Sequence, residues 1–296
     1  TTVGVKDSAA AVTFNFAAAT GASDAATLAL ADSTANVTLA EIETVTVNST
    51  TGSVADTVVN GGTLTFADAE KVVITGDQAL AATVVGANIK EVDASTFTKA
   101  LTLTHSTGPS ALAIKGGAGA DTFNITDNAN DKVTLDMGAG NDTLNIRTNA
   151  FHAITTGEGS DTINVAFAAG THKALDISTA AKLGQSAVVI TDFKSGTDVL
   201  NIAADVGGAE IALTGTQLAT VAGAANLLAA AQAAFTQGAT AKGVALVAGD
   251  SVTFQYGADT YVIVDGNTSA NALSADDLLI KLTGVSSVVA ADITVS

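Results

Sequence analysis

The chain has 296 residues, and its 12 basic and 29 acidic side chains give a net charge of −17. This acidic excess argues against nucleic acid as a partner, because binding phosphates needs clustered Lys and Arg. Charged residues are only 14% of the chain, which excludes a disordered acidic tail. Cysteine is absent, and no run of about 18 apolar residues predicts a membrane span. The surplus carboxylates suit cation binding, with a solvated acidic surface as the alternative.

The N-terminal region, residues 1–115, is rich in short β-branched segments that predict strands. A phrase in which a glutamate leads into a valine-containing strand recurs at 42–47, 69–75 and 88–95. We interpret these segments as rungs of an irregular parallel β-solenoid. A β-sandwich is the competing interpretation, although it favours hairpin turns and more aromatics than the 4% found here. The expected strands are Val12–Phe16, Thr27–Ala31, Val37–Leu39, Glu43–Val47, Thr63–Phe66, Val72–Thr75, Glu91–Asp93, Leu101–Thr104 and Ala111–Ile114.

The next segment, residues 116–165, repeats one motif three times, as GGAGADTFNI, MGAGNDTLNI and TGEGSDTINV. Its anchors are Asp121, Asp142 and Asp161, whose spacing corresponds to one coil of two strands. Second strands are expected at Lys132–Asp136 and Ala153–Thr155. Each repeat is therefore turn, strand, turn, strand, and the three Gly-Asp turns are expected to stack on one edge.

The chemistry of these turns points to a hard cation. Glycine permits backbone angles that other residues resist, so the turns are expected to expose carbonyl oxygens, and each turn adds one carboxylate. Oxygen donors in that number suit Ca²⁺, whereas the absence of nitrogen and sulfur ligands argues against zinc and copper. A solenoid without metal is the alternative, but three aligned carboxylates would then repel one another. The expected donors are Gly116, Gly117, Ala118, Gly119, Asp121, Gly138, Ala139, Gly140, Asp142, Gly157, Glu158, Gly159 and Asp161.

This segment resembles the RTX (repeats-in-toxin) nonapeptide G-G-x-G-x-D-x-U-x, in which U is a large apolar residue. Gly116–Phe123 matches at every fixed position, whereas Met137 and Thr156 replace the first glycine of the other two copies. The resemblance implies a right-handed parallel β-roll that holds Ca²⁺ between successive turns. The threonine-rich strands around Thr102 and Thr104 also resemble the solenoids of bacterial surface-layer proteins that carry RTX repeats.

Residues 166–203 are expected to continue the roll less regularly. The stretch VVITDFKSGTDVLN resembles the I-T-D-F-x-x-G-x-D element that closes many RTX β-rolls in secreted proteases and lipases. That resemblance implies that Asp192 and Asp198 are further Ca²⁺ ligands. An ordinary capped turn is the alternative.

The C-terminal region, residues 204–296, is expected to cap the solenoid. An alanine-rich amphipathic segment predicts one helix over 216–237, ended by Gly238. A hairpin is predicted over 251–265, and Ser274 with Asp277 is expected to cap a short turn of helix. The ending resembles the C-terminal region of RTX proteins exported by type I secretion, which carries the export signal.

Catalytic motifs are missing from the sequence, so no enzyme is expected. His105, His152 and His172 are scattered, no H-E-x-x-H occurs, and each histidine is expected to be a surface or strand residue. The serine of the third Gly-Asp turn stands in the wrong place for a G-x-S-x-G elbow.

The expected architecture is all-β, with an irregular solenoid in 1–115, a Ca²⁺-binding β-roll in 116–203 and the cap in 204–296. The chain starts Thr1-Thr2-Val3 without methionine, so we expect a fragment of a longer protein. The resemblance implies a structural surface-layer fragment, secreted by a type I apparatus, that self-assembles into a two-dimensional lattice on a Gram-negative cell. Anchoring to lipopolysaccharide would come only from a part outside this chain. The alternative is a Ca²⁺-binding secretion and folding module behind a secreted enzyme or adhesin.

Overall fold

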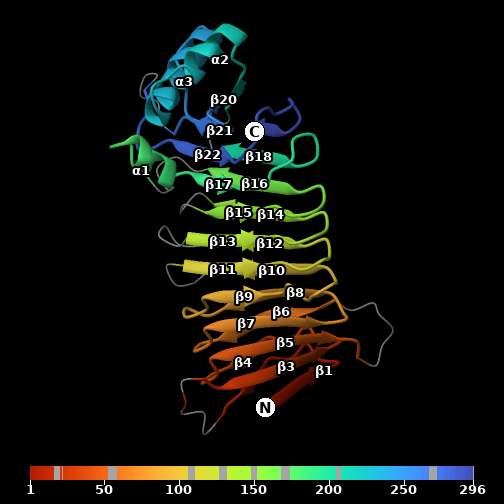
Figure 1. Cartoon of the computed structure of the whole chain (residues 1–296). Coiled ribbons are helices and arrows are strands. Elements are labelled where there is room, and N and C mark those ends of the chain that lie inside the picture. Colours follow the sequence, from red (N-terminus) through yellow and green to blue (C-terminus); the bar gives the residue numbers. More distant parts are fainter. Residues whose placement is uncertain are drawn as a thin grey trace. The chain divides into compact units, whose positions relative to one another are not determined.

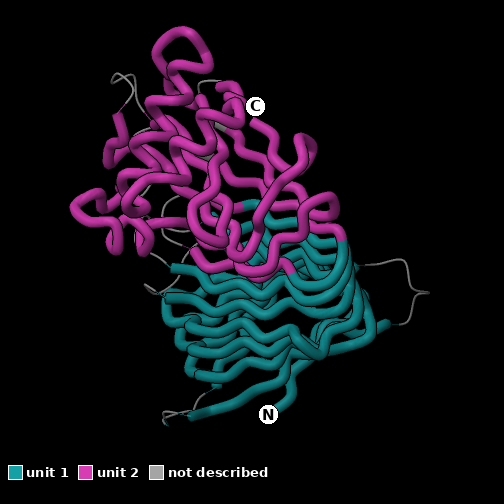
Figure 2. Tube along the Cα trace, turned by 45° about the horizontal axis from the view of Figure 1, so that its top comes forward, with its two compact units in different colours: residues 1–145, 157–159 teal, residues 146–156, 160–296 magenta. Residues whose placement is uncertain are grey.

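The computed structural model describes residues 1–295 except 17–20, 22, 53–58, 106–110, 127–131, 148–151, 168–173, 205–207 and 267–271. The protein is a mostly β parallel solenoid, with 13 described strands in sheet A and 10 in sheet B. Its contacts divide the chain into two compact units, coloured separately in Figure 2. Unit 1 comprises residues 1–145 and 157–159, and unit 2 comprises residues 146–156 and 160–296. The domain boundaries expected after residues 115 and 203 stay predictions.

In unit 1 the chain alternates between the two sheets, so that each coil contributes one strand to sheet A and one to sheet B (Figure 1). The strand pairs are parallel, as where Leu28 lies beside Val47 and Val47 beside Ile74. Sheet A contains β1 (Thr2–Lys6), β3 (Ala25–Ala31), β5 (Thr44–Thr50), β7 (Lys71–Gly76), β9 (Glu91–Asp93), β11 (Ala111–Lys115) and β13 (Lys132–Asp136). Sheet B contains β2 (Val12–Phe14), β4 (Val37–Leu39), β6 (Asn60–Phe66), β8 (Leu80–Val85), β10 (Leu101–His105), β12 (Thr122–Ile125) and β14 (Thr143–Arg147).

The core of unit 1 follows from the two-residue period of its strands. In β5, Val45 and Val47 are fully buried while Thr44 and Thr46 face outward. The coils are thin, so Leu, Ile, Val and a few Phe side chains fill the space between the sheets, among them Phe66 and Phe123. The expected β-solenoid is therefore correct.

Sequence patterns located most strands of unit 1 but missed two. The structure adds β1, which has a glycine at its centre, and β8, whose alanines weaken the β-branched signal. Both strands form by pairing with neighbours that the chain places beside them, β1 with β3 and β8 with β6 and β10. Local propensity was therefore a weaker guide than the stack itself.

Unit 2 has its own strand order in each sheet. In sheet A the order is β15 (Ala153–Thr155), β17 (Val188–Ile190), β22 (Leu278–Leu282), β21 (Asp259–Val264), β20 (Ser251–Tyr256) and β19 (Glu210–Ile211). In sheet B it is β16 (Thr162–Phe167), β18 (Val199–Ala204) and β23 (Ile293–Val295). The pairs β20–β21 and β21–β22 are antiparallel, so the predicted hairpin is correct.

The single helix predicted over 216–237 is wrong, because two helices occupy this region. Helix α2 (Gly215–Ala222) ends at Gly223, and α3 (Leu227–Lys242) starts behind Asn226, whose side chain accepts a hydrogen bond from Ala229 N at 3.0 Å. Gly238 does not stop the helix: it is buried, and a Cβ there would lie 2.6 Å from a methyl of Val252. The helix ends instead at Gly243, which has a φ of 76°.

The helices pack on one face of β20 and β21 through an apolar cluster that includes Phe235, Val252, Phe254 and Tyr261. Rings of Phe254 and Tyr261 stack with their centroids 5.5 Å apart. A short helix that the sequence did not predict, α1 (Ala180–Gln185), belongs to the same cluster through Leu183. Among the described helices, none combines the length and the apolar character that crossing a membrane requires.

The helical turn expected at Ser274 and Asp277 is also wrong, although the capping contact exists. Ser274 N donates to Asp277 Oδ2 at 2.6 Å, and Asp276 N donates to Ser274 Oγ at 3.1 Å. The chain then continues as strand β22, because pairing with β17 and β21 satisfies its backbone.

Candidate metal centre

The three Gly-containing turns of the repeat lie one above another in unit 1, as their spacing predicts. Ala139 N donates to Gly117 O at 2.9 Å, and Glu158 N donates to Gly138 O at 3.0 Å. Gly140 N donates to Glu158 O at 2.8 Å, and Ala139 forms a parallel bridge with Glu158. Some carbonyl oxygens that the sequence assigned to a cation therefore accept backbone hydrogen bonds from the next turn.

Glycine is required in these turns for two different reasons. The second and third turns use the left-handed region, with φ of 99° at Gly138, 133° at Gly140, 93° at Gly157 and 139° at Gly159. The first turn does not, because neither of its glycines at 117 and 119 has a positive φ. The expectation of unusual backbone angles is therefore correct for the later turns and wrong for the first, although that turn matches the nonapeptide best.

What all three turns share is a lack of space for a side chain. A Cβ at Gly117 would lie 2.1 Å from Phe97 O, and one at Gly138 would lie 2.1 Å from Gly117 O. At Gly159 the gap to Gly140 O would be 1.6 Å. The glycine carbonyl oxygens are thus directed along the stack, each toward the glycine of the following turn.

Asp121, the first anchor, is buried to 1% exposure and points into its own turn. Its Oδ2 accepts a hydrogen bond from Gly117 N at 3.1 Å, and its Oδ1 accepts one from Leu101 N of the preceding coil at 2.9 Å. One carboxylate therefore closes its turn and ties two coils together.

The contact with a backbone amide of the preceding coil recurs at Asp142 and Asp198. Asp142 Oδ1 accepts from Asp121 N at 2.8 Å in unit 1. In unit 2, Asp198 Oδ1 accepts from Asp161 N at 3.1 Å, and its Oδ2 accepts from Lys194 N at 2.8 Å. Asp142, Asp161 and Asp198 are each 1% exposed. A buried carboxylate therefore stands just before each of the four sheet B strands β12, β14, β16 and β18.

Asp192, the other aspartate of the closing element, lies at the end of β17 and is only partly buried. Its Oδ1 accepts from Thr156 N at 2.7 Å and from Thr156 Oγ1 at 3.0 Å. The same hydroxyl contacts Asp198 Oδ2 at 3.3 Å. Thr156, which departs from the nonapeptide consensus, therefore bonds two carboxylates, whereas the other departure, Met137, is fully buried among apolar side chains.

Burial destabilises the ionised form of at least one of these carboxylates. Desolvation raises the pKa of Asp121 above its usual value, although the hydrogen bonds from the Gly117 and Leu101 amides act in the opposite direction. Among the ion pairs of the described residues, none includes Asp121. A cation or a proton near this carboxylate would relieve the desolvation cost.

A metal here would need backbone donors, because no three His, Cys, Asp or Glu side chains of the described residues gather as a metal site. The donors present are hard oxygens: buried carboxylates, and glycine carbonyls in a space that a Cβ would fill. This set fits Ca²⁺ in chemistry. Metal binding would compete with the amides that already donate to the same oxygens.

Unit 2 contains three further buried aspartates of this kind among its described residues. Only Asp277 was expected from the sequence, as the cap of a short helical turn. Asp250 accepts from Val247 N and Ala209 N, Asp277 accepts from Ser274 N and Gly266 N, and Asp292 accepts from Val289 N and Gly196 N. Each carboxylate closes its local turn and reaches a distant amide. The available signal is weak, because only Asp250 follows a glycine.

Two of them differ in charge environment. Lys242 Nζ pairs with the carboxylate of Asp250. Desolvation raises the pKa of Asp277 to about 7, with nearby Asp265 contributing to the increase. Asp277 therefore changes its charge near neutral pH.

The asparagine of the D-T-x-N phrase forms ladders on the outer side of sheet B. In unit 1, Asn145 Nδ2 donates to Asn124 Oδ1 at 2.7 Å, and Asn124 Nδ2 lies 3.4 Å from Thr104 Oγ1. In unit 2, Asn201 Nδ2 donates to Asn164 Oδ1 at 2.8 Å. The repeated asparagine therefore joins coils, which the motif alone did not indicate.

The two described histidines, His105 and His152, are not part of the Gly-Asp turns. His105 belongs to β10 and is fully buried, with Nδ1 3.0 Å from Val84 O. His152 is buried rather than on the surface, and burial lowers its pKa to about 4 despite a hydrogen bond to Arg147 O. His172 lies outside the described residues.

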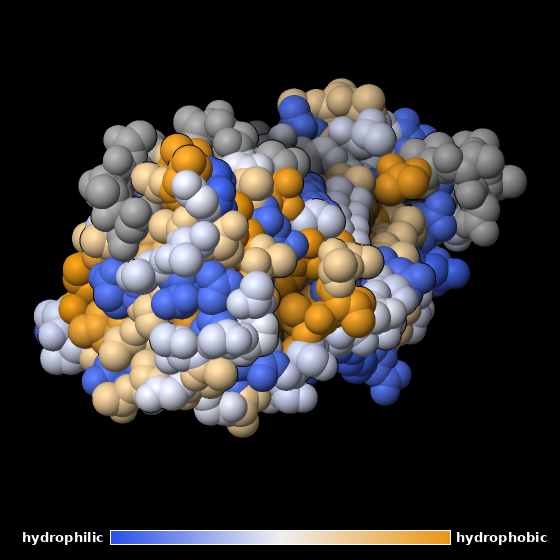
Figure 3. All heavy atoms as spheres, turned by 90° about the horizontal axis from the view of Figure 1, so that it is seen from above, coloured by the Kyte–Doolittle hydropathy of each residue, from blue (hydrophilic) through white to orange (hydrophobic). Residues whose placement is uncertain are grey.

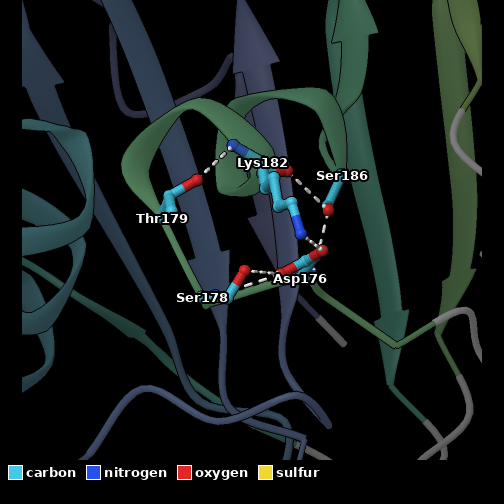
Figure 4. A network of polar contacts seen from close by, with 5 residues as sticks. All are labelled: Asp176, Ser178, Thr179, Lys182 and Ser186. Carbon is cyan, nitrogen blue, oxygen red and sulfur yellow. Dashed lines mark hydrogen bonds and ion pairs between the residues drawn. The ribbon is translucent and has the colours of Figure 1, made fainter.

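Two other regions of unit 2 could be considered as sites: a groove beside α2 and a polar network around α1. A groove of about 610 Å³ beside α2 and β20 is lined by apolar, Ser, Thr and Gln side chains, without a carboxylate, imidazole or amine. Figure 3 shows this end of unit 2 from above, with apolar residues in small groups among polar ones. Figure 4 shows a network around α1 in which Asp176 accepts from Ser178 and pairs with Lys182, while Thr179 caps the helix.

Comparison with known proteins adds no assignment to this geometry. No protein-family model matches the chain, and the search of curated proteins found no match. The functional conclusion therefore depends on the turns themselves.

Proposed function

We propose that this chain is a structural fragment of an RTX-type bacterial surface-layer protein that folds with Ca²⁺ and self-assembles into a two-dimensional lattice. The observation that carries the proposal is the stack of Gly-Asp turns with inward-facing, buried carboxylates. The carboxylate of Asp121 accepts hydrogen bonds from two backbone amides and takes part in none of the described ion pairs. A divalent cation supplies the missing charge.

In this proposal the chain's own residues hold the ion. Carboxylates of Asp121, Asp142 and Asp161 provide the charge, and carbonyls of the stacked glycines complete the shell. Asp192 and Asp198 serve the closing element in the same way. The bound ion contributes electrostatic neutralisation, so the turns tighten when it is present and loosen when it is removed.

Calcium then acts as a switch between compartments. A site with a dissociation constant of about 10⁻⁴ M gains about 1.4 kcal/mol at about 1 mM Ca²⁺ and essentially nothing at about 10⁻⁷ M. With several such sites, a marginally stable chain stays unfolded at the low Ca²⁺ concentration inside the cell and folds at the higher concentration outside. That behaviour suits export through a type I apparatus and assembly on the surface of a Gram-negative cell.

The test follows thermal unfolding by circular dichroism in Ca²⁺, in Mg²⁺ and in chelator. We expect the midpoint to rise in Ca²⁺ only, because Mg²⁺ prefers rigid, partly hydrated octahedral sites. A full β signal with an unchanged midpoint in chelator would contradict Ca²⁺-dependent folding.

Electron microscopy of the same samples separates this proposal from its alternative. Ordered sheets in Ca²⁺ support the surface-layer function. Dispersed, folded particles that still need Ca²⁺ favour a secretion and folding module carried behind an enzyme or adhesin.

A further inference from the structure

The outer face of sheet B carries no charged side chain from β4 to Asn145 of β14, and Arg147 at the exposed end of β14 is the first charged residue beyond it. We define the threonine face as the outward side chains of β4 to β14 between Thr38 and Asn145, all of which are Thr, Asn, Ala, Val or Gly. Its central row runs across four neighbouring strands as Thr63, Thr83, Thr104 and Asn124, which lie in register.

Sheet A of the same unit provides the contrast. Its outward side chains include Lys71, Glu91, Asp93, Lys115 and Lys132. Lys71 Nζ lies 3.1 Å from a carboxylate oxygen of Glu91, and Lys115 Nζ lies 3.7 Å from the other. Charged side chains are therefore concentrated on the outer face of sheet A, whereas sheet B carries only Arg147 at the end of β14.

The threonine face is also ordered before any contact is made. Thr is β-branched and has few rotamers, and Asn124 and Asn145 hold each other by a hydrogen bond of 2.7 Å. Ordering these side chains against a partner therefore loses little conformational entropy. Hydroxyl groups both donate and accept hydrogen bonds, so the face is complementary to a copy of itself.

We propose that the threonine face is the surface through which two copies of this chain meet. The proposal rests on the self-assembly suggested above and names the face that performs it. Two molecules of like charge approach each other at least cost where neither carries charge, since repulsion falls with distance from the charged side. A two-fold contact uses the same patch on both copies, which this self-complementary face permits.

The size of the face fits a weak contact within an array. Six strands about 4.8 Å apart, each about four residues long at about 3.3 Å per residue, give roughly 400 Å² per copy. A stable isolated dimer buries about 800 Å² on each partner. Pairs are therefore transient in dilute solution, and they accumulate when many copies are held together.

Charge substitutions test the contact directly. The double variant Thr83→Glu with Thr104→Glu adds two negative charges to the threonine face, and Thr46→Glu with Ala113→Glu adds the same charge to sheet A. By sedimentation at high concentration in Ca²⁺, we expect the first variant to associate at least tenfold more weakly than the natural chain and the second to be unchanged. Mixing the first variant with Thr83→Lys plus Thr104→Lys is expected to restore association.

Cysteine crosslinking tests the face without added charge, and the cysteine-free chain gives a clean background. Single variants Thr63→Cys, Thr83→Cys and Thr104→Cys, alone and in pairwise mixtures, are expected to form disulfide-linked dimers at least fivefold faster than Thr46→Cys or Ala113→Cys. Circular dichroism in Ca²⁺ confirms that each variant is folded.

The outcomes separate the two proposals. Ca²⁺-dependent sheets that form equally with the Glu variants, or that crosslink through sheet A, overturn the assignment of the face and leave the surface-layer function standing. A natural chain that does not associate at any Ca²⁺ concentration, together with cysteine variants that do not crosslink, overturns both. A face reserved for another kind of partner would leave all the cysteine variants monomeric, which also contradicts the proposal.

Discussion

At equivalent positions at or just before the start of successive sheet B strands, a backbone amide donates a hydrogen bond to the next coil, and the acceptor is of two kinds. Ser33 N donates to the side chain of Asn60 at 2.8 Å, and Asn60 N and Leu80 N donate to backbone carbonyls of Ala79 and Ala100, each at 3.1 Å. From Leu101 onward the acceptor is a carboxylate, first of Asp121 and then of Asp142. Neutral groups therefore tie the upstream coils, and ionisable groups tie the later ones.

This difference indicates which coils depend on pH and on cations for their stability. Asn60 is fully buried, and its Nδ2 donates to Thr50 O at 2.9 Å and Leu30 O at 3.1 Å, so it needs neither a proton nor an ion. Asp121 makes the same contact to the preceding coil but carries a charge. Upstream coils are expected to fold independently of cations, and the Gly-Asp coils are expected to depend on them.

Exchanging the two side chains gives the largest expected effect. Asn60→Asp places a carboxylate against carbonyl oxygens of Leu30 and Thr50, so it loses donors and buries an unpaired charge. We expect a loss of about 5 kcal/mol in the free energy of unfolding, measured by denaturant titration. Asp121→Asn keeps one acceptor oxygen and is expected to cost about 1–2 kcal/mol while reducing the response to Ca²⁺. Equal costs for the two changes would contradict the division between neutral and ionisable ties.

The pH dependence of unit 2 is expected to be nearly as large. The pKa of Asp277 is raised from 3.8 to about 7, so its stabilising contribution is complete below pH 3.8 and is lost as pH rises toward 7. The shift corresponds to about 4 kcal/mol. Asp277→Asn is expected to remove this dependence from thermal midpoints recorded between pH 4 and 8.

Asp276→Asn, at the exposed neighbouring position, is the matched control and should keep the natural profile. Buried His152 acts in the opposite direction, because its pKa is lowered to about 4 and its contribution is lost as pH falls below 6.5. That contribution is common to all variants and cancels in the difference between them. A natural profile in Asp277→Asn would show that this carboxyl does not titrate as proposed.

Glycine replacement in the stack is expected to cost about 3 kcal/mol. In Gly159→Ala the new Cβ would lie 1.6 Å from Gly140 O, on a backbone with φ of 139°. Gly257→Ala is the control: its φ is 67°, but nothing lies within 4 Å, so only the conformational cost of about 1 kcal/mol applies. Thermal unfolding of both variants in Ca²⁺ measures the difference. Similar losses would mean that the turns separate easily and do not need close stacking.

Calcium titration gives the smallest effect and the finest distinction. If one ion lies between each pair of successive turns, Asp142 faces two ions and Asp121 faces one. Isothermal titration is expected to show that Asp142→Ala loses more Ca²⁺ than Asp121→Ala, at about 1.4 kcal/mol per site. Asp161→Ala is expected to be intermediate, because its turn adjoins the less regular coil that follows. Equal losses at residues 121 and 142 would contradict single-file stacking.

The sequence by itself determined the coil and the stacking of its repeated turns. The spacing of Asp121, Asp142 and Asp161 fixed the length of a coil, and alternation in the D-T-x-N strands fixed which side chains face inward. The hairpin around Gly257 was equally readable. These features are local, because a two-residue period and a glycine turn act within one coil.

The contacts that the repeated Asp and Gly residues make became visible only in the tertiary structure. Asp121 points inward, where its carboxylate satisfies the buried amide of Leu101 in the preceding coil. Whether a glycine is needed for its φ, as at Gly140, or for space, as at Gly117, depends on the carbonyl stacked against it. Such contacts join residues about 20 positions or more apart, so no local pattern encodes them, and the strands β1 and β8 followed the same rule.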